Sequence, residues 1–125
     1  MRHRVAGKRL GRNGSARRAL GRSLVVGLLT SPALRIVTTV SKAKWVRGFA
    51  DSVCSSLARA VTEDVSLNVH RSLARRLGGR CRHGMVVRAV RGVSFKIGGG
   101  NIRITKLPSR RLGDAGRLAL VEVVR

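Results

Sequence analysis

The sequence predicts an α/β protein: a two-layer sandwich of helices packed on a small mixed sheet, with a basic extended N-terminal arm. Apolar residues recur at helical spacing between positions 43 and 61, and residues 102–106 and 118–124 alternate as strands do. Residues 1–12 carry positive charge without apolar periodicity, so no core holds them. We therefore expect a flexible basic arm over residues 1–12 and one compact domain over residues 13–125.

The arm and the segment after it are strongly cationic. Eight of the first 22 residues are Lys or Arg, and none is acidic. Such a segment stays disordered until a partner neutralises it. A dense polyanion suits this segment because guanidinium groups bind phosphate oxygens bidentately. The eight cationic residues are Arg2, Arg4, Lys8, Arg9, Arg12, Arg17, Arg18 and Arg22.

A first helix is expected to begin near residues 13–15, where small polar side chains cap the free amides. Ser31-Pro32 ends this helix. Residues 34–40 then alternate and are rich in branched side chains, which predicts a strand. The stripe of the helix that we expect to be buried is Leu20, Leu24 and Leu28, flanked by Val25 and Leu29.

Ser41 is placed to cap a second helix that runs to about residue 60. Lys42 and Lys44 fall in its first turn, where cations oppose the helix macrodipole. Such local conflicts often mark functional sites, and solvated lysines on an exposed turn are the alternative. The apolar stripe of this helix is Ala43, Val46, Ala50, Val53, Leu57 and Val61.

A third helix is predicted from Val65 to Leu77. Thr62-Glu63-Asp64 forms a turn and cap in front of it, with acids where the macrodipole favours them. Gly78-Gly79 follows its last turn, as is typical of helix C-termini. Residues 85–90 fit either a strand or a short amphipathic helix, and the pattern alone does not decide between them.

The C-terminal third predicts a pair of strands. Gly98-Gly99-Gly100 is expected to be a flexible connector before the strand at residues 102–106. A loop from Pro108 to Arg117 leads to the strand at residues 118–124. This connection predicts an antiparallel pair, and residues 34–40 would complete the small sheet.

The charge balance narrows the classes of function. The formal net charge is +22, from 27 Lys and Arg against five acids. Self-repulsion on this scale weakens a compact state unless a partner screens it, so a solvated basic face is the weaker interpretation. Trp45, Phe49 and Phe95 are the only Trp, Phe or Tyr residues, so base stacking on an aromatic platform is not the expected mode of binding.

Metal and enzyme chemistry are poorly supported. Cys54 and Cys81 make no disulfide framework in a domain of this size. With His70 and His83 they offer four possible zinc ligands, but their spacing matches no zinc ribbon or finger. No nucleophile, base and orienting acid occur at catalytic spacing. We expect no metal, no other cofactor, no small-molecule substrate and no catalysis.

Membrane insertion is also not expected. The longest uncharged run, residues 23–34, is interrupted by Pro32 and too short to cross a bilayer. The basic start followed by an apolar run imitates a signal peptide, and the Arg-rich, acid-free start imitates an organelle presequence.

Three segments carry a resemblance to a known family. The first matches at Met1-Arg2-His3-Arg4, Gly7, Leu10, Arg12 and Arg17. The second matches at Ile36, Thr38-Thr39, Lys42-Ala43-Lys44 and Asp51. The third matches at Gly99-Gly100, Arg103-Ile104, Lys106-Leu107, Arg110-Arg111, Gly113-Asp114-Ala115 and Ala119 to Glu122. In this order and spacing the chain resembles bacterial large-subunit ribosomal protein seventeen over essentially its full length.

The resemblance implies a structural protein of the large ribosomal subunit, in the cytoplasm, encoded by a bacterial or organelle genome. Its partners would be ribosomal RNA, near the polypeptide exit, and neighbouring large-subunit proteins. It favours a helix at residues 85–90. The chain departs from the family at Trp45, where an acidic residue is usual, and at Asn101, where an aromatic residue is usual; residues 67–96 match loosely.

The residues expected to contact RNA are Arg2, His3, Arg4, Lys8, Arg9, Arg12, Arg17, Arg18, Arg22, Lys42, Lys44, Arg103, Lys106, Arg110 and Arg111. Recognition would rest on RNA shape and phosphates with little base specificity. The alternative is a free nucleoid-associated DNA-binding protein that uses the same charge. That class requires a recognition helix with base-reading residues or a dimer seam, and the sequence offers neither.

Overall fold

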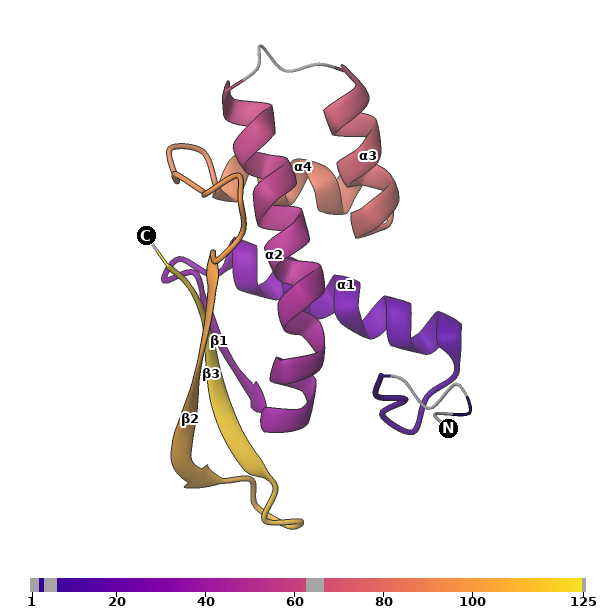
Figure 1. The fold of residues 1–125 in the computed structure, drawn as a ribbon, viewed down its shortest axis with the longest axis vertical. Coiled ribbons are helices and arrows are strands. Elements are labelled where there is room, and N and C mark those ends of the chain that lie inside the picture. Colours follow the sequence, from indigo (N-terminus) through magenta and orange to yellow (C-terminus); the bar gives the residue numbers. More distant parts are fainter. Residues whose placement is uncertain (1–2, 4–6, 63–66, 125) are drawn as a thin grey trace.

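A computed structural model describes residues 3, 7–62 and 67–124, and Figure 1 shows how they are arranged. The described residues form a mixed α/β fold of helices and one sheet, as the sequence predicts. In chain order the elements are α1 (Gly14–Thr30), β1 (Arg35–Thr39), α2 (Val40–Thr62), α3 (Leu67–Leu77), α4 (Arg80–Ala89), β2 (Ile102–Arg110) and β3 (Arg117–Val123).

The sheet has the order β1-β3-β2, and both strand pairs are antiparallel. The predicted mixed sheet is therefore wrong. The first strand joins the free edge of β3, which runs in the opposite direction, and does not pair with β2. At the centre of the sheet, Val121 lies opposite Ile36 on one side and Ile104 on the other. Alternate residues of β3 are buried, which fixes this register.

The helices α1 and α2 pack on the sheet, and this part of the molecule has the predicted two layers. The remaining helices, α3 and α4, pack on α1 and α2 at the end opposite to the β2–β3 hairpin loop (Figure 1). They extend the core beyond the sheet, because Leu73, Leu77 and Val86 are fully buried against the other helices.

The first helix begins where the sequence predicts. The Oδ1 atom of Asn13 accepts a hydrogen bond from the Ala16 amide at 2.9 Å, and Ser31 ends the helix. Its buried face, however, runs through Gly21, Val25, Leu28 and Leu29, whereas Leu20 and Leu24 are only half-buried. The predicted stripe is thus rotated, because α2 approaches α1 on the side of Gly21.

The second helix carries its predicted stripe. Ala43, Val46, Ala50, Val53 and Leu57 are all buried, and the side chain of Val61 lies outside the description. The helix begins at Val40, directly after β1, so Ser41 lies in its first turn and is not the residue before it. The predicted turn at 62–64 is not tested, because residues 63 and 64 lie outside the described residues.

The middle of the chain is helical. The third helix ends at Leu77, and the amides of Gly78 and Gly79 both donate to the Ala74 carbonyl. Residues 85–89 belong to α4, and Val90 caps it, so the ambiguous segment is a helix. The resemblance favoured this assignment.

The predicted loop starts too early. The strand β2 continues through Pro108 to Arg110, with an irregular register between Lys106 and Arg110. Proline lacks a donor for the ladder, but an irregular segment of an edge strand accommodates it. The connecting loop therefore spans only residues 111–116.

One junction around the buried Asn101 side chain fixes the start of β2 against α2, and we call it the Asp51 junction (Asp51, Lys96, Gly99, Gly100 and Asn101). The Asp51 carboxylate accepts hydrogen bonds from the amides of Asn101 at 2.8 Å and Gly100 at 3.1 Å. The fully buried Asn101 side chain bonds the backbone of Lys96 in both directions. The glycine connector is therefore tied to α2 and is not the free segment that the sequence predicts.

Gly99 permits this close approach. Its φ angle is +93°, and a Cβ atom at this position would lie 2.9 Å from the Oδ2 atom of Asp51. Only glycine accepts both the backbone conformation and the contact. Burial alone would raise the pKa of the Asp51 carboxyl, but the hydrogen bonds from Asn101 and Gly100 and the charge of Arg47 lower it below its ordinary value.

Candidate nucleic-acid interface

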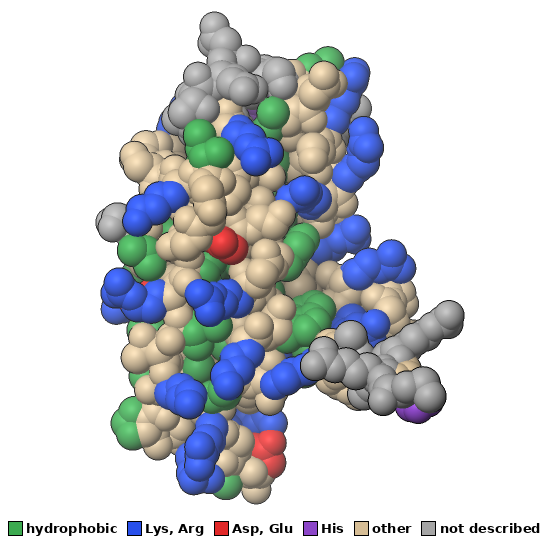
Figure 2. Space-filling model, viewed as in Figure 1, with side chains coloured by type: hydrophobic (Ala, Val, Ile, Leu, Met, Phe, Trp, Pro, Cys, Tyr) green, Lys and Arg blue, Asp and Glu red, His purple; other side chains and the backbone are tan. Residues whose placement is uncertain are grey.

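Cations from three separate segments lie at one end of the molecule. The arm before α1, the start of α2 and the β2–β3 hairpin loop all lie in the lower half of Figure 1. Figure 2 shows Lys and Arg side chains over much of this face, with few acidic groups among them. We call this region the basic end, and it comprises Lys8, Arg9, Arg12, Lys42, Lys44, Lys106, Arg110, Arg111 and Arg117.

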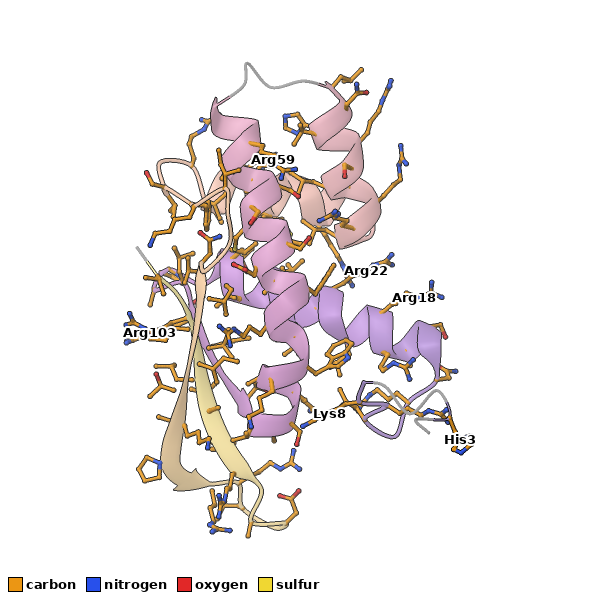
Figure 3. All side chains as sticks on the ribbon, viewed as in Figure 1. His3, Lys8, Arg18, Arg22, Arg59 and Arg103 are labelled. Carbon is orange, nitrogen blue, oxygen red and sulfur yellow. The ribbon has the colours of Figure 1, made fainter. Side chains whose placement is uncertain are left out.

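The described part of the arm turns back on itself. The Arg12 amide donates to the Arg9 carbonyl at 3.1 Å, and the Arg12 guanidinium donates to the Leu10 carbonyl at 3.0 Å. These bonds close a turn over residues 9–12, a part of the arm that the sequence predicts to be extended. His3 and the cations of this segment are exposed (Figure 3), while Arg2 and Arg4 lie outside the described residues.

Three arginines on α1 have different surroundings. Arg17 is half-buried and donates to the Arg12 carbonyl at 2.9 Å, which holds the arm turn against the helix start. Arg18 is exposed, and within the described residues it makes no hydrogen bond or ion pair. Arg22 points toward the end of α3, as Figure 3 shows.

Arg22 closes the end of α3. Its Nε atom donates to the Arg76 carbonyl at 3.0 Å, and Nη2 donates to the Arg75 carbonyl at 3.3 Å. Carbonyls at a helix C-terminus lack partners within the helix, and a cation there also interacts favourably with the negative end of the macrodipole. Arg22 was predicted only as an RNA contact, and the structure gives it a role within the protein.

The start of α2 and the hairpin loop form a shallow hollow. It has a volume of about 450 Å³ and is lined by Thr39, Val40 and Ser41 on one side and by Arg111, Asp114, Gly116 and Arg117 on the other. Lys42 is half-buried and Lys44 is exposed in the same turn of α2. The first turn of α2 contains no acidic residue, so its positive dipole end has no charge partner of its own.

The hairpin loop places like charges together. Arg110 and Arg117 lie directly opposite each other in the register of β2 and β3. Like charges in such a pair destabilise a sheet, unless a counterion lies between them. The Arg110 guanidinium also donates to the Ala115 carbonyl at 3.3 Å. The facing arginines therefore lower the stability of the hairpin at the ends of its two strands.

Two of the predicted contacts already have acidic partners. Arg103 lies opposite Glu122 and forms an exposed ion pair with it at 3.6 Å. Arg111 forms a two-pronged ion pair with Asp114, and this hydrogen bonding lowers the pKa of the Asp114 carboxyl well below its usual range. The arginines of both pairs are exposed, and such surface pairs contribute little to stability. Lys106 is exposed on β2.

Other exposed cations were missing from the predicted set. Five of them, Arg71, Arg75, Arg82, Arg88 and Arg91, lie on α3, α4 and the segment after α4, away from the basic end. Others are Arg35 on β1, Arg47 and Arg59 on α2, Lys96 before β2 and Arg117 on β3. Their charge was visible in the sequence, but no motif separated them from solvated surface residues. Arg76 is also absent from the predicted set, and it donates to the Ser52 Oγ atom at 2.7 Å, joining α3 to α2.

The described residues contain no group of three or more potential metal ligands. Cys54 is fully buried on α2, and burial raises the pKa of its thiol to about 12. The side chains of Cys81 and His83 lie outside the description. Within the described part of the chain, no helix is both long and apolar enough to span a bilayer.

Fold and site together define a class: a small α/β protein in which cations greatly outnumber acids and cover much of the surface, the basic end included. The chain is 38% identical over 131 residues to large ribosomal subunit protein bL17 of Thermus thermophilus, covering 99% of both chains. It is 36% identical over 127 residues to bL17 of Thermotoga neapolitana, covering 99% of this chain and 95% of the relative. The protein of Campylobacter jejuni is 34% identical over 124 residues, with 99% of each chain covered. The chain therefore belongs to the bL17 family of large ribosomal subunit proteins.

No family model matches the chain. Membership of the family rests on the full-length relatives, and it confirms the resemblance that the sequence carried. It also confirms the expectation of a large-subunit ribosomal protein that is not an enzyme.

Proposed function

We propose that this protein is a structural constituent of the large ribosomal subunit that binds ribosomal RNA through its basic end. The observation that carries the proposal is the meeting of cations from the arm, the start of α2 and the hairpin loop at one end. Among the described residues, most of these cations have no acidic partner. Folded RNA supplies phosphates at the density that this surface needs.

Residues 1–12 act as the RNA-binding arm, and residues 13–125 are the domain that carries it. The exposed cations of the arm, together with Arg18, bind phosphates along one RNA segment. Lys42, Lys44, Arg110 and Arg111 bind phosphates of a second segment from the folded body. Recognition by shape and backbone fits this arrangement, because the described cations are spread over several elements and do not form one base-reading helix.

The subunit supplies the remaining partners. Neighbouring large-subunit proteins would contact the surfaces that RNA leaves free. The resemblance to the family supports a position near the polypeptide exit of the cytoplasmic ribosome.

Salt dependence tests the proposal. If the basic end neutralises about 6–10 phosphates, affinity for large-subunit RNA should fall about 10³–10⁵-fold between about 50 and 200 mM salt, as for duplex DNA. The measurement is filter binding of the full chain to a large-subunit RNA fragment across salt concentrations. A flat dependence would overturn the proposal. Sedimentation of cell extracts separates the alternative, because a nucleoid protein would not travel with large subunits.

A further inference from the structure

Two of the three aromatic residues meet at one place on the surface. Trp45 and Phe49 lie one turn apart on α2, and both are half-buried. A Cβ atom on Gly21 of α1 would lie 3.0 Å from Cη2 of Trp45 and 3.6 Å from Cδ1 of Phe49. Because glycine has no Cβ, both rings approach the backbone of α1 closely. The sequence alone gave no reason to pair these rings with Gly21, which lies more than twenty positions away.

A groove of about 290 Å³ opens beside these rings. Its walls are almost entirely apolar, and its lining is completed by Arg18, Arg22 and Arg76. Arginine presents an aliphatic stem to such a surface and keeps its charge at the edge. Figure 2 shows hydrophobic side chains exposed beside Lys and Arg side chains where α1 leaves the body of the molecule.

Two of the three arginines that line the groove are held by hydrogen bonds within the protein, and the third is left to bind a ligand. Arg22 is held by the carbonyls at the end of α3, and Arg76 is held by Ser52 and Ser56 of α2. These bonds fix the position of α3 relative to the other two helices. Arg18 has no such partner in the described residues, and Figure 3 shows it on the same side of α1 as Arg22.

We propose that this groove binds one unpaired nucleotide of RNA, with its base against Trp45 and Phe49 and a phosphate beside Arg18. The inference rests on the proposed function and names one contact within it. The occupant must combine a flat apolar surface with negative charge, and a nucleotide does so. The volume lies near the lower limit of about 300 Å³ for small-ligand sites, so the groove accepts one planar group.

A neutral apolar side chain from a neighbouring protein fits the groove less well. It would fill the apolar part but make no use of the exposed positive charge of Arg18, whereas a nucleotide engages both. Base stacking on aromatic rings tolerates any base sequence, because every base has a π-face. One stacked base in this groove is therefore consistent with a protein that otherwise binds RNA through phosphates.

Fluorescence of the unmodified protein tests the inference, because Trp45 is the only tryptophan in the chain. The full chain is titrated with a short single-stranded RNA and with a blunt RNA duplex that carries the same number of phosphates. We expect the single strand to quench Trp45 emission in a saturable manner. The duplex should bind with little quenching, because its bases are already stacked.

Variants give an independent measurement of affinity. Trp45→Leu keeps the groove apolar but removes the flat ring, and it should weaken single-strand binding about 5- to 150-fold, the range for base–aromatic stacking. Its affinity for the duplex should not change. Phe95→Leu is the matched control, since Phe95 lies outside the groove lining, and it should bind both RNAs like the unmodified chain.

The outcomes separate this inference from the function it rests on. If neither RNA binds with a dependence on salt, the proposed function itself fails. If both RNAs bind, Trp45 emission is unchanged and Trp45→Leu binds normally, only the groove assignment is overturned. Ultraviolet crosslinking of assembled large subunits gives a third result. A nucleotide adduct on the Trp45 peptide supports the inference, and a crosslink from this peptide to a neighbouring protein overturns it.

Discussion

The Asp51 junction and the basic end treat charge in opposite ways. At the junction, one carboxylate is satisfied by two backbone amides and by the Asn101 side chain, so it is balanced within the protein. At the basic end, Arg110 faces Arg117 and two lysines occupy the positive end of α2. Internal partners thus maintain the fold, and cations that mostly lack acidic partners form the binding surface. Substitutions at the Asp51 junction should therefore change the stability of the fold, and substitutions at the basic end should change the affinity for RNA.

Removal of the Asp51 carboxylate should have the largest effect on stability. Asp51→Ala leaves the amides of Gly100 and Asn101 without their acceptor beside a buried side chain. Loss of hydrogen bonds to a charged acceptor costs about 2–3 kcal/mol. Denaturant unfolding monitored by circular dichroism measures the loss. The salt dependence of RNA binding should stay as in the unmodified chain; a large change in that slope would break the distinction between the regions.

Acid should act on the same junction. The pKa of the folded Asp51 carboxyl is lowered from its ordinary 3.8, so its contribution to stability is fully present above that value. The contribution is lost as the pH falls through the folded pKa. Asp51→Asn keeps the shape but removes the titrating group, so its stability should vary less with pH below 3.8. Equal acid sensitivity of the two chains would contradict this assignment.

The sequence predicted the parts of this comparison that depend on local spacing. The buried stripe of α2 follows from the helical period alone, and Asn13 was identifiable as a cap. The partners of Asp51 lie about fifty positions away, so no local pattern linked the carboxylate to Asn101. Pro108 was interpreted as the start of a loop, because the irregular edge that accommodates it depends on pairing with β3.

The candidate site shows the same limit. The composition shows that the site is cationic, but it does not show which residues contact each cation. Arg18 and Arg22 are identical in type and lie one turn apart, yet only Arg22 reaches the end of α3. That difference depends on a helix more than fifty positions further along the chain. Sequence identified the charge of the site, and the tertiary structure decides which charges are already in use.

Arg18 and Arg22 show the same contrast between binding and stability within a single helix. Arg22→Gln removes two hydrogen bonds and a cation from the C-terminus of α3, and it should lower the free energy of unfolding by about 1 kcal/mol. Arg18→Gln should leave stability unchanged and reduce RNA affinity. Thermal unfolding and filter binding measure the two effects. Equal loss of stability in both variants would show that Arg18 also has a partner within the protein.

Substitution of Lys42 and Lys44 should have a small effect on stability, and it is the only expected gain. Both lie in the first turn of α2, where their charge opposes the macrodipole. The double change to Gln should therefore raise stability by about 0.3–1 kcal/mol at low salt. If each lysine binds one phosphate, the slope of log affinity against log salt should fall by up to about 1.8.

Arg88 is the matched control for these lysines, because it lies in the last turn of α4, where a cation is favourable. Arg88→Gln should lower stability slightly and leave the salt slope nearly unchanged. A gain in stability for the double lysine variant and a loss for Arg88→Gln would show that the lysines of α2 serve binding and destabilise the folded state. If the double lysine variant loses stability instead, the lysines serve the fold, and the basic end would no longer differ from the Asp51 junction.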